Sequence, residues 1–237
     1  GPLDTPSAPS ADGCLYAAGG KGKPQTVPIG KDGSQTAPTN PLFSLQLTPS
    51  LQKEWVRLPD FPGPARVQPV LTAQQSEDGI RLYLAGGFQP ASAHQEAIVC
   101  TEMLSYHPKT KQWRNEGFLP SLAGGSHRTV TGGCAIASGD SSILLVGGVN
   151  YDRFRDALNY PEPDYLLHPA DWYKFNTSLL QYNTFTKHWT HLGNYEELAR
   201  AGAGIANNAN TVIIIGGELK PGIRTPEVNA FKLTRHP

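Results

Sequence analysis

Four short apolar runs in this chain each end in a pair of glycines, at residues 15–18, 82–85, 144–146 and 213–215. The first glycine of each pair is residue 19, 86, 147 or 216, so the pattern advances by 67, 61 and 69 residues. Apolar runs of this length predict buried β-strands, and glycine turns sharply with positive φ at no steric cost. A repeat of this kind is typical of stacked, similar structural units.

A second pattern follows each of the first three glycine pairs. An alternating apolar and polar run leads through a short turn segment into another run, which carries Trp55, Trp113 or Trp189. Turn residues between alternating runs predict β-hairpins, and a four-stranded propeller blade needs such a hairpin on its outer side. We therefore predict an all-β fold, a β-propeller whose central channel is lined by the strands that enter the four Gly-Gly turns.

The repeat predicts one propeller domain over residues 14–237. Residues 1–13 resemble the scar left by removal of a tag, and they lack the basic and apolar regions of a signal peptide. The expected blades are 14–58, 67–119, 131–192 and 201–233. The first blade lacks an inner strand in this assignment, and the last lacks an outer strand with a tryptophan.

These two incomplete blades predict an incomplete ring. A propeller removes its exposed sheet edges by closing on itself. We therefore expect this chain to supply most of a larger ring, with open edges at both ends unless another segment or another chain pairs there. A closed four-bladed ring is the weaker alternative.

Two insertions interrupt the regular spacing. Residues 21–40 are rich in Gly, Pro, Lys, Gln and Thr, a composition that predicts a mobile surface loop. Residues 150–175 instead contain many aromatic side chains, which a polar loop does not need. We expect this aromatic insertion (150–175) to pack as a lid or helical excursion over one face, where loops often carry function.

Composition narrows the classes of partner. The 20 Lys and Arg residues balance 20 Asp and Glu residues, whereas proteins that bind nucleic acids or anionic membranes have a basic surplus. No apolar run of about 18 residues is present, as a membrane-spanning helix would need. The three cysteines, Cys14, Cys100 and Cys134, do not form a disulfide framework, although one disulfide stays open. The seven histidines lack compact metal-ligand spacing, so we expect no metal.

The segment 216–225 carries the clearest candidate chemistry. Glu218 follows the fourth glycine pair directly, and Arg224 comes after a Pro-Gly turn that can fold it back towards Glu218. An arginine can bind the carboxylate of a ligand with two parallel hydrogen bonds, and a glutamate can act as a general base. The alternative is a local ion pair that closes the turn, and the spacing by itself favours this alternative.

The same segment, Gly-Glu-x-Lys-Pro-Gly-x-Arg-Thr at 217–225, resembles the signature of the bacterial N-acetylneuraminate epimerases, the sialic acid mutarotases of the kelch-propeller type. Further segments that resemble this family are 61–66, 106–113, 147–150 and 171–176. The resemblance covers most of the chain from about Cys14, in the same blade order. Two segments depart from the pattern: the first loop is longer here, and 124–128 does not align, which leaves His127 unplaced.

For the fold, the resemblance implies a kelch-type β-propeller of six blades, of which this chain holds about four. The other two blades would follow Leu233 in the usual order, or precede Cys14 in a circularly permuted branch of the family. A homodimer or a second chain is a further way to complete the ring. The family resemblance also implies a periplasmic or otherwise exported protein.

For the function, the resemblance implies interconversion of the α and β anomers of N-acetylneuraminate by acid/base opening and closing of the ring. Glu218 is implied as the proton acceptor and Arg224 as the partner of the substrate carboxylate. Arg66 and Asn150 match the family pattern as further substrate-binding residues. The implied partner is a small acidic sugar, and the reaction needs no metal or redox cofactor.

Two other functions stay open at this point. One is a non-enzymatic kelch module that binds a protein partner, which predicts hydrophobic or charged patches on the loop face and no buried Glu–Arg pair. The other is a propeller that acts on a different acidic sugar, because a fold does not fix the substrate.

Overall fold

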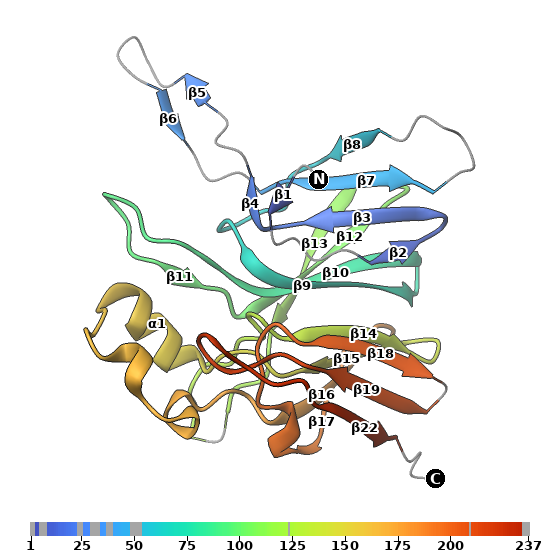
Figure 1. Ribbon diagram of the computed structural model, residues 1–237. Coiled ribbons are helices and arrows are strands. Elements are labelled where there is room, and N and C mark those ends of the chain that lie inside the picture. Colours follow the sequence, from blue (N-terminus) through green and yellow to red (C-terminus); the bar gives the residue numbers. More distant parts are fainter. Residues whose placement is uncertain are drawn as a thin grey trace.

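The computed structural model describes residues 3–4, 9–22, 26–28, 34–36, 40–47, 54–122, 124–208 and 210–233. Most of its regular structure is β-strand, in four antiparallel sheets that follow one another as the blades of a β-propeller. Figure 1 shows the sheets stacked in chain order, from the first blade in blue at one side to the fourth in red at the other. The predicted all-β propeller fold is confirmed, whereas a ring of six blades stays a prediction.

Each blade contains three or four long or short strands that pair with their neighbours along the chain. The first blade contains β2 (Ser10–Ala11), β3 (Cys14–Ala18), β7 (Leu42–Gln46) and β8 (Trp55–Leu58). The second contains β9 (Val67–Ser76), β10 (Gly79–Gln89), β12 (Glu102–His107) and β13 (Gln112–Phe118), with β11 (Ile98–Val99) paired to the end of β10. The third contains β14 (Cys134–Ser138), β15 (Ser142–Val146), β16 (Ser178–Asn183) and β17 (Trp189–Asn194). The fourth contains β18 (Gly204–Asn208), β19 (Thr211–Ile215) and β22 (Val228–Lys232).

Short strands in the N-terminal part form two small pairs outside the blades. These are β1 (Leu3–Asp4) with β4 (Lys21–Gly22), and β5 (Thr26–Pro28) with β6 (Ser34–Thr36). The second pair lies in the insertion 21–40, for which the sequence predicts a mobile loop. The rest of that expectation lies outside the described residues, at 23–25, 29–33 and 37–39.

The three tryptophan hairpins form as predicted. Trp55 pairs with Leu45 across β7 and β8, and the two later tryptophans lie opposite tyrosines. The rings of Tyr106 and Trp113 are 5.0 Å apart, and those of Tyr182 and Trp189 are 4.8 Å apart. The recurring tryptophan therefore packs against the neighbouring strand of its own blade.

The blades meet along their first strands rather than along the strands that enter the Gly-Gly turns. Strand β9 contacts β2 and β14, and β14 contacts β18. Strands β3, β10, β15 and β19 enter the glycine pairs, and each is second in its sheet. The prediction that these second strands line the centre is therefore wrong, because in each blade the preceding strand lies closer to the neighbouring blade.

The ends of the blade series differ from the sequence assignment in one respect. Strand β2 pairs with β3 over two residues, Ser10 with Leu15 and Ala11 with Cys14, so the first blade has a short inner strand. The expectation that this strand is missing is corrected. In the fourth blade the described strands end with β22 at the sheet edge, and no strand pairing within the described residues joins this blade to the first.

The glycine pairs are the points where one blade touches the next. The N–H of Gly148 donates to the carbonyl of Arg200 at 2.8 Å, and the N–H of Gly20 donates to the carbonyl of Arg66 at 2.7 Å. At Gly147, φ is +67°, and a Cβ atom would lie 2.7 Å from the carbonyl oxygen of Arg200. Glycine is therefore required here for its backbone conformation and for the close approach of the next blade.

Side chains reinforce the same junctions from within each blade. The Arg200 guanidinium donates to the carbonyl of Gly216 at 3.2 Å and to the carboxylate of Glu227 at 2.8 Å. In the third blade, the buried amide nitrogen of Asn176 lies 3.1 Å from the carbonyl oxygen of Gly147 and 3.0 Å from that of Val149. A polar side chain thus satisfies the carbonyl of the first glycine in both blades.

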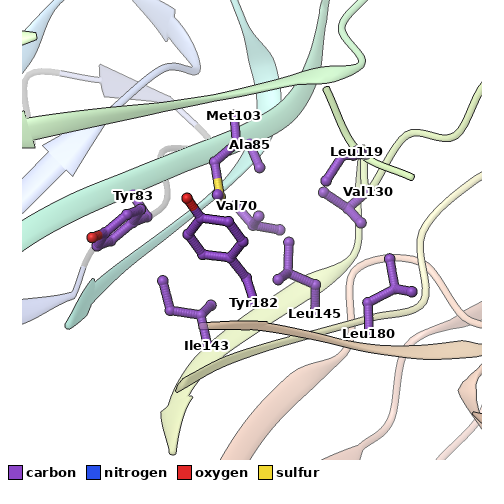
Figure 2. Packing of buried hydrophobic residues seen from close by; sticks show 10 residues of the cluster. All are labelled: Val70, Tyr83, Ala85, Met103, Leu119, Val130, Ile143, Leu145, Leu180 and Tyr182. Atoms are coloured by element: carbon purple, nitrogen blue, oxygen red, sulfur yellow. The ribbon is translucent and has the colours of Figure 1, made fainter. Parts of the chain in front are cut away.

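Hydrophobic packing fills the space between the second and third blades. Figure 2 shows ten buried side chains of this cluster: Val70, Tyr83, Ala85, Met103, Leu119, Val130, Ile143, Leu145, Leu180 and Tyr182. The rings of Tyr83 and Tyr182 meet edge to face, with centroids 6.1 Å apart. Full burial of one large aliphatic or aromatic side chain contributes roughly 1.5–3 kcal/mol, so this cluster is a main source of adhesion between the two blades.

A buried carboxylate crosses the same interface. Glu116 accepts hydrogen bonds from Ser105 at 2.5 Å and Arg114 at 2.8 Å in its own blade, and from the Tyr182 hydroxyl at 3.1 Å in the third. Burial alone would raise the pKa of the Glu116 carboxyl, but the hydrogen bonds from Ser105 and Arg114 outweigh burial and hold the pKa below its ordinary value. The ionised form is therefore the one that joins the blades.

Replacing Gly147 with alanine should lower the free energy of unfolding by roughly 2 kcal/mol or more, because the new Cβ meets backbone of the next blade and φ is positive. Thermal or denaturant unfolding measures this loss. Gly139→Ala is the control, since Gly139 has a φ of +58° but no atom within 4 Å of the added Cβ. Equal losses in the two variants would show that the close approach has no energetic weight.

Candidate active site

A short hairpin carries both residues of the candidate motif. Strand β20 (Glu218–Lys220) pairs with β21 (Ile223–Arg224), and this pairing places Glu218 opposite Arg224. The Arg224 Nε donates to Glu218 Oε1 at 3.4 Å. We call the segment 218–224 the site hairpin. The Pro-Gly turn therefore returns the arginine to the glutamate, as the sequence predicts.

The ion pair itself contributes little to stability. The Arg224 side chain is 82% exposed and the Glu218 side chain 30% exposed. Exposed ion pairs contribute about 0–1 kcal/mol. In addition, within the described residues neither Nη group of Arg224 has a hydrogen-bond partner. The contact orients two reactive groups and leaves most donors of the arginine available to a ligand.

Backbone hydrogen bonds fix Glu218 on the rigid part of the fourth blade. Its N–H donates to the carbonyl of Ala201 at 2.7 Å, and the N–H of Ala201 donates back to the carbonyl of Glu218 at 3.0 Å. The N–H of Thr225 closes the other end of the hairpin on the carbonyl of Gly217 at 2.9 Å. The carboxylate is therefore presented from a position held at both ends.

Both residues line one cavity of about 500 Å³, here called the Glu–Arg cavity. Small-molecule sites typically have volumes of about 300–1,000 Å³. Among the described residues that line the cavity, Glu218 and Arg224 are the only charged ones. The other lining residues are Gln68, Val149, Phe154, Tyr165, Phe175, Ala201, Gly202, Gly217 and Pro221. Glu218 and Arg224 thus form a charged wall in a largely apolar and aromatic surrounding.

The aromatic insertion (150–175) supplies the facing wall through Phe154, Tyr165 and Phe175. It folds as α1 (Tyr151–Asn159) followed by two 3₁₀ turns, η1 (Tyr165–Leu167) and η2 (Ala170–Tyr173). Figure 1 shows this helical segment at one end of the sheets, beside β11. The expectation of a helical excursion that borders the site end is confirmed, although the sequence did not indicate which of its aromatic residues reach the cavity.

Packing within the aromatic insertion holds these rings in place. Tyr173 and Phe175 are buried together with Val149, and Phe154, Tyr165 and Trp172 pack against them. The side chain of Asn159 at the end of α1 exchanges hydrogen bonds with the backbone of Ala97, at 2.7 Å and 3.2 Å. The insertion is therefore attached to the second blade as well as to its own.

Asn150 does not line the Glu–Arg cavity. Its Oδ1 accepts a hydrogen bond from the N–H of Arg153 at 3.0 Å, so it is the N-cap of α1. It lines a neighbouring cavity of about 690 Å³, which shares Phe175 with the Glu–Arg cavity. The contacts of Asn150 explain its place in the fold, and its role in substrate binding stays a prediction.

Arg66 is likewise separated from the Glu–Arg cavity. Its side chain has no exposed surface, and its guanidinium donates to the carbonyl of Gly86 at 3.0 Å and to the carboxylate of Glu102. Arg200 makes the matching contacts in the fourth blade. The repetition indicates a structural function for both arginines, and the substrate-binding role of Arg66 stays a prediction.

Sequence reasoning singled out neither Gln68 nor Lys220, which also belong to this region. Gln68 lies on β9 at the beginning of the second blade and lines the Glu–Arg cavity. Lys220 lies on the site hairpin and contacts the aromatic insertion. No local pattern marks Gln68, whereas Lys220 stands inside the motif at 217–225 and was overlooked because it carries no acid/base role.

Possible metal ligands gather at one place in the described part of the chain. One potential ligand atom from each of Glu162, Asp164 and His168 lies within 4.8 Å of the others. Both carboxylates are exposed, and exposed acidic groups are common without an ion, so the cluster alone does not identify a metal site. All three cysteines are free thiols, and burial raises the pKa of Cys100 and of Cys134 to about 11.

The geometry of the site hairpin agrees with a comparison of sequence families. A family model described as N-acetylneuraminate epimerase matches residues 25–236. The chain belongs to the N-acetylneuraminate epimerase family. Within the described residues, no helix combines the length and apolar character that crossing a membrane requires.

Individual relatives of this family match at moderate identity. The N-acetylneuraminate epimerase of Pasteurella multocida (strain Pm70) is 27% identical over 216 residues, which cover 85% of this chain and 52% of the relative. That of Haemophilus influenzae (strain PittEE) is 30% identical over 192 residues, which cover 76% of this chain and 48% of the relative. The chain therefore spans about half the length of the curated relatives it matches.

A solved structure supports the fold independently. The structure of YjhT aligns with a TM-score of 0.74 at 23% sequence identity, over 99% of this chain and 63% of that one. A likeness at this identity shows a shared fold and extends across all four blades described here.

Arg66→Met should lower the free energy of unfolding by about 3–5 kcal/mol, because it leaves the partly buried carboxylate of Glu102 without its partner. Denaturant unfolding measures the loss. Arg155→Met is the control, since Arg155 pairs with exposed acids on α1 and its loss should cost less than about 1 kcal/mol. An Arg66 variant of unchanged stability that no longer binds a sialic acid would instead support the substrate-binding role.

Proposed function

We propose that the propeller to which this chain contributes interconverts the α and β anomers of N-acetylneuraminate. The observation that carries the proposal is the shared cavity, in which a glutamate and an arginine stand side by side opposite an aromatic wall. Membership of the N-acetylneuraminate epimerase family supports the same substrate.

The substrate has a carboxylate and a hydroxyl group on the same anomeric carbon. A protein that binds the one and deprotonates the other therefore needs a cation and a base close together. Arg224 and Glu218 meet this requirement, with 3.4 Å between Nε and Oε1. The Nη groups of Arg224 would bind the substrate carboxylate with two parallel hydrogen bonds, which leaves Glu218 beside the anomeric hydroxyl.

Ring opening then needs two proton movements. Glu218 accepts the proton of the anomeric hydroxyl, the bond from the anomeric carbon to the ring oxygen breaks, and a ketone carbonyl forms at that carbon. The ring oxygen takes a proton from an acid. Rotation about the adjacent C–C bond presents the other face of the carbonyl, and closure reverses both proton transfers. The sequence of steps is balanced without an oxidant, a reductant or a metal.

The aromatic wall suits the rest of such a ligand. Phe154, Tyr165 and Phe175 offer flat apolar surfaces to the C–H faces of the sugar. The exposure of Arg224 means that burial of the pair does not by itself separate an enzyme from a binding module. The enzymatic proposal rests instead on the common cavity and the family, and a measured rate of anomer exchange decides between them.

Glu218→Gln should slow mutarotation by roughly 10²–10⁴-fold, because the amide keeps the shape of the side chain but cannot accept the proton. One-dimensional proton NMR follows the α anomer as it is released from an α-sialoside, with and without the protein. Glu197→Gln is the matched control, at an exposed position outside the Glu–Arg cavity, and should leave the rate unchanged. A folded Glu218→Gln variant of unchanged rate would reduce Glu218 to one half of a turn-closing ion pair.

Arg224→Lys should raise KM by roughly 10-fold or more and change kcat less, because lysine keeps the charge but loses the planar pair of donors. One hydrogen bond to a charged group contributes about 1.5–3 kcal/mol. Initial rates of anomer exchange at several substrate concentrations separate the two constants, with Arg155→Lys on α1 as the control. An unchanged KM would remove Arg224 from substrate binding.

A further inference from the structure

One contact joins the two walls of the Glu–Arg cavity directly. The Nζ of Lys220, on the site hairpin, donates to the carbonyl of His168 at 2.6 Å and to the carbonyl of Leu166 at 3.1 Å. These carbonyls lie 52 and 54 residues away in sequence, in the aromatic insertion. Both bonds are charge-assisted, so they are stronger than bonds between neutral groups.

The accepting carbonyls belong to the end of a very short helix. The turn η1 (Tyr165–Leu167) has three residues, and His168 follows it as the C-cap. Carbonyls at a helix C-terminus lack partners inside the helix, and a lysine side chain can satisfy them. Lys220 therefore supplies to η1 the donors that its own backbone cannot.

The turn that Lys220 holds carries a ring of the cavity wall. Tyr165, the first residue of η1, lines the Glu–Arg cavity opposite Glu218 and Arg224. On its other side η1 is supported by aromatic contacts: the His168 ring stacks on Trp172 at 3.9 Å, and the Tyr173 hydroxyl donates to the carbonyl of Tyr165. The turn is thus held between the core of the insertion and the site hairpin.

We propose that Lys220 is a positioning residue that sets the width of the Glu–Arg cavity by connecting Tyr165 to the hairpin of Glu218 and Arg224. Lys220 is not among the residues that line the cavity, so it acts through the turn rather than on a ligand. The proposal rests on the proposed function in so far as the ligand is an acidic sugar. Its structural part, the attachment of η1 to the site hairpin, does not depend on the identity of that ligand.

Three variants test the connection. Lys220→Met keeps an unbranched side chain but removes the donors, Lys220→Arg keeps donors within reach of both carbonyls, and Lys232→Met removes an exposed lysine on β22 as the control. Hydrogen exchange, followed by mass spectrometry of peptides from 161–173, reports attachment of the turn. Initial rates of anomer exchange report KM and kcat, and thermal unfolding shows that each variant is folded.

Lys220→Met should speed exchange in 161–173 by roughly 10-fold, the order supplied by one charge-assisted hydrogen bond. It should raise KM by a similar factor with less effect on kcat, because Glu218 and Arg224 stay in place. Lys220→Arg should restore most of both values, and Lys232→Met should resemble the unmodified protein.

Two results would overturn the proposal. Unchanged exchange in 161–173 would show that Lys220 does not hold the turn, and faster exchange with unchanged KM would show that the held turn does not shape the cavity. Failure of the proposed function looks different, because the unmodified protein would then not accelerate anomer exchange at all. The hydrogen-exchange comparison would still decide whether Lys220 attaches the turn.

Discussion

The close approach of each glycine pair to the backbone of the next blade is the constraint on which the arrangement depends. Gly148 donates to the carbonyl of Arg200, and Gly20 donates to the carbonyl of Arg66. A side chain at Gly147 would push these strands apart, since its Cβ would lie 2.7 Å from a carbonyl oxygen. Apolar packing between blades then follows, because the inner strands are already brought into contact.

The candidate site is an extension of this junction. In the fourth blade the chain leaves the glycine pair and turns at once into the site hairpin, whose backbone pairs with Ala201 at the entry to the same blade. Glu218 therefore inherits its position from the structural repeat. Arg200, one residue before Ala201, stabilises the repeat from inside. Structural and functional residues are adjacent in sequence here because one turn serves both purposes.

Local sequence patterns predicted the parts of the molecule that local physics determines. Glycine pairs after apolar runs, and a tryptophan after each turn, suffice to predict blades and hairpins, and the motif at 217–225 predicted the meeting of Glu218 with Arg224. Arg66 was misleading because a buried arginine and a ligand-binding arginine look alike in sequence. The strands that meet between blades, and the residues that connect the insertion to the hairpin, depend on contacts between distant segments, which periodicity does not encode.

The amide of Asn176 illustrates a consequence for production of the protein. Residues 176–178 read Asn-Thr-Ser, the acceptor sequence for N-linked glycans. The nitrogen that a glycan would occupy is buried and lies within hydrogen-bond distance of the carbonyls of Thr129, Gly147 and Val149. A eukaryotic secretory host that modified Asn176 during translocation would therefore attach a bulky oligosaccharide at the very point where the third blade closes, and the chain would be glycosylated at the expense of folding.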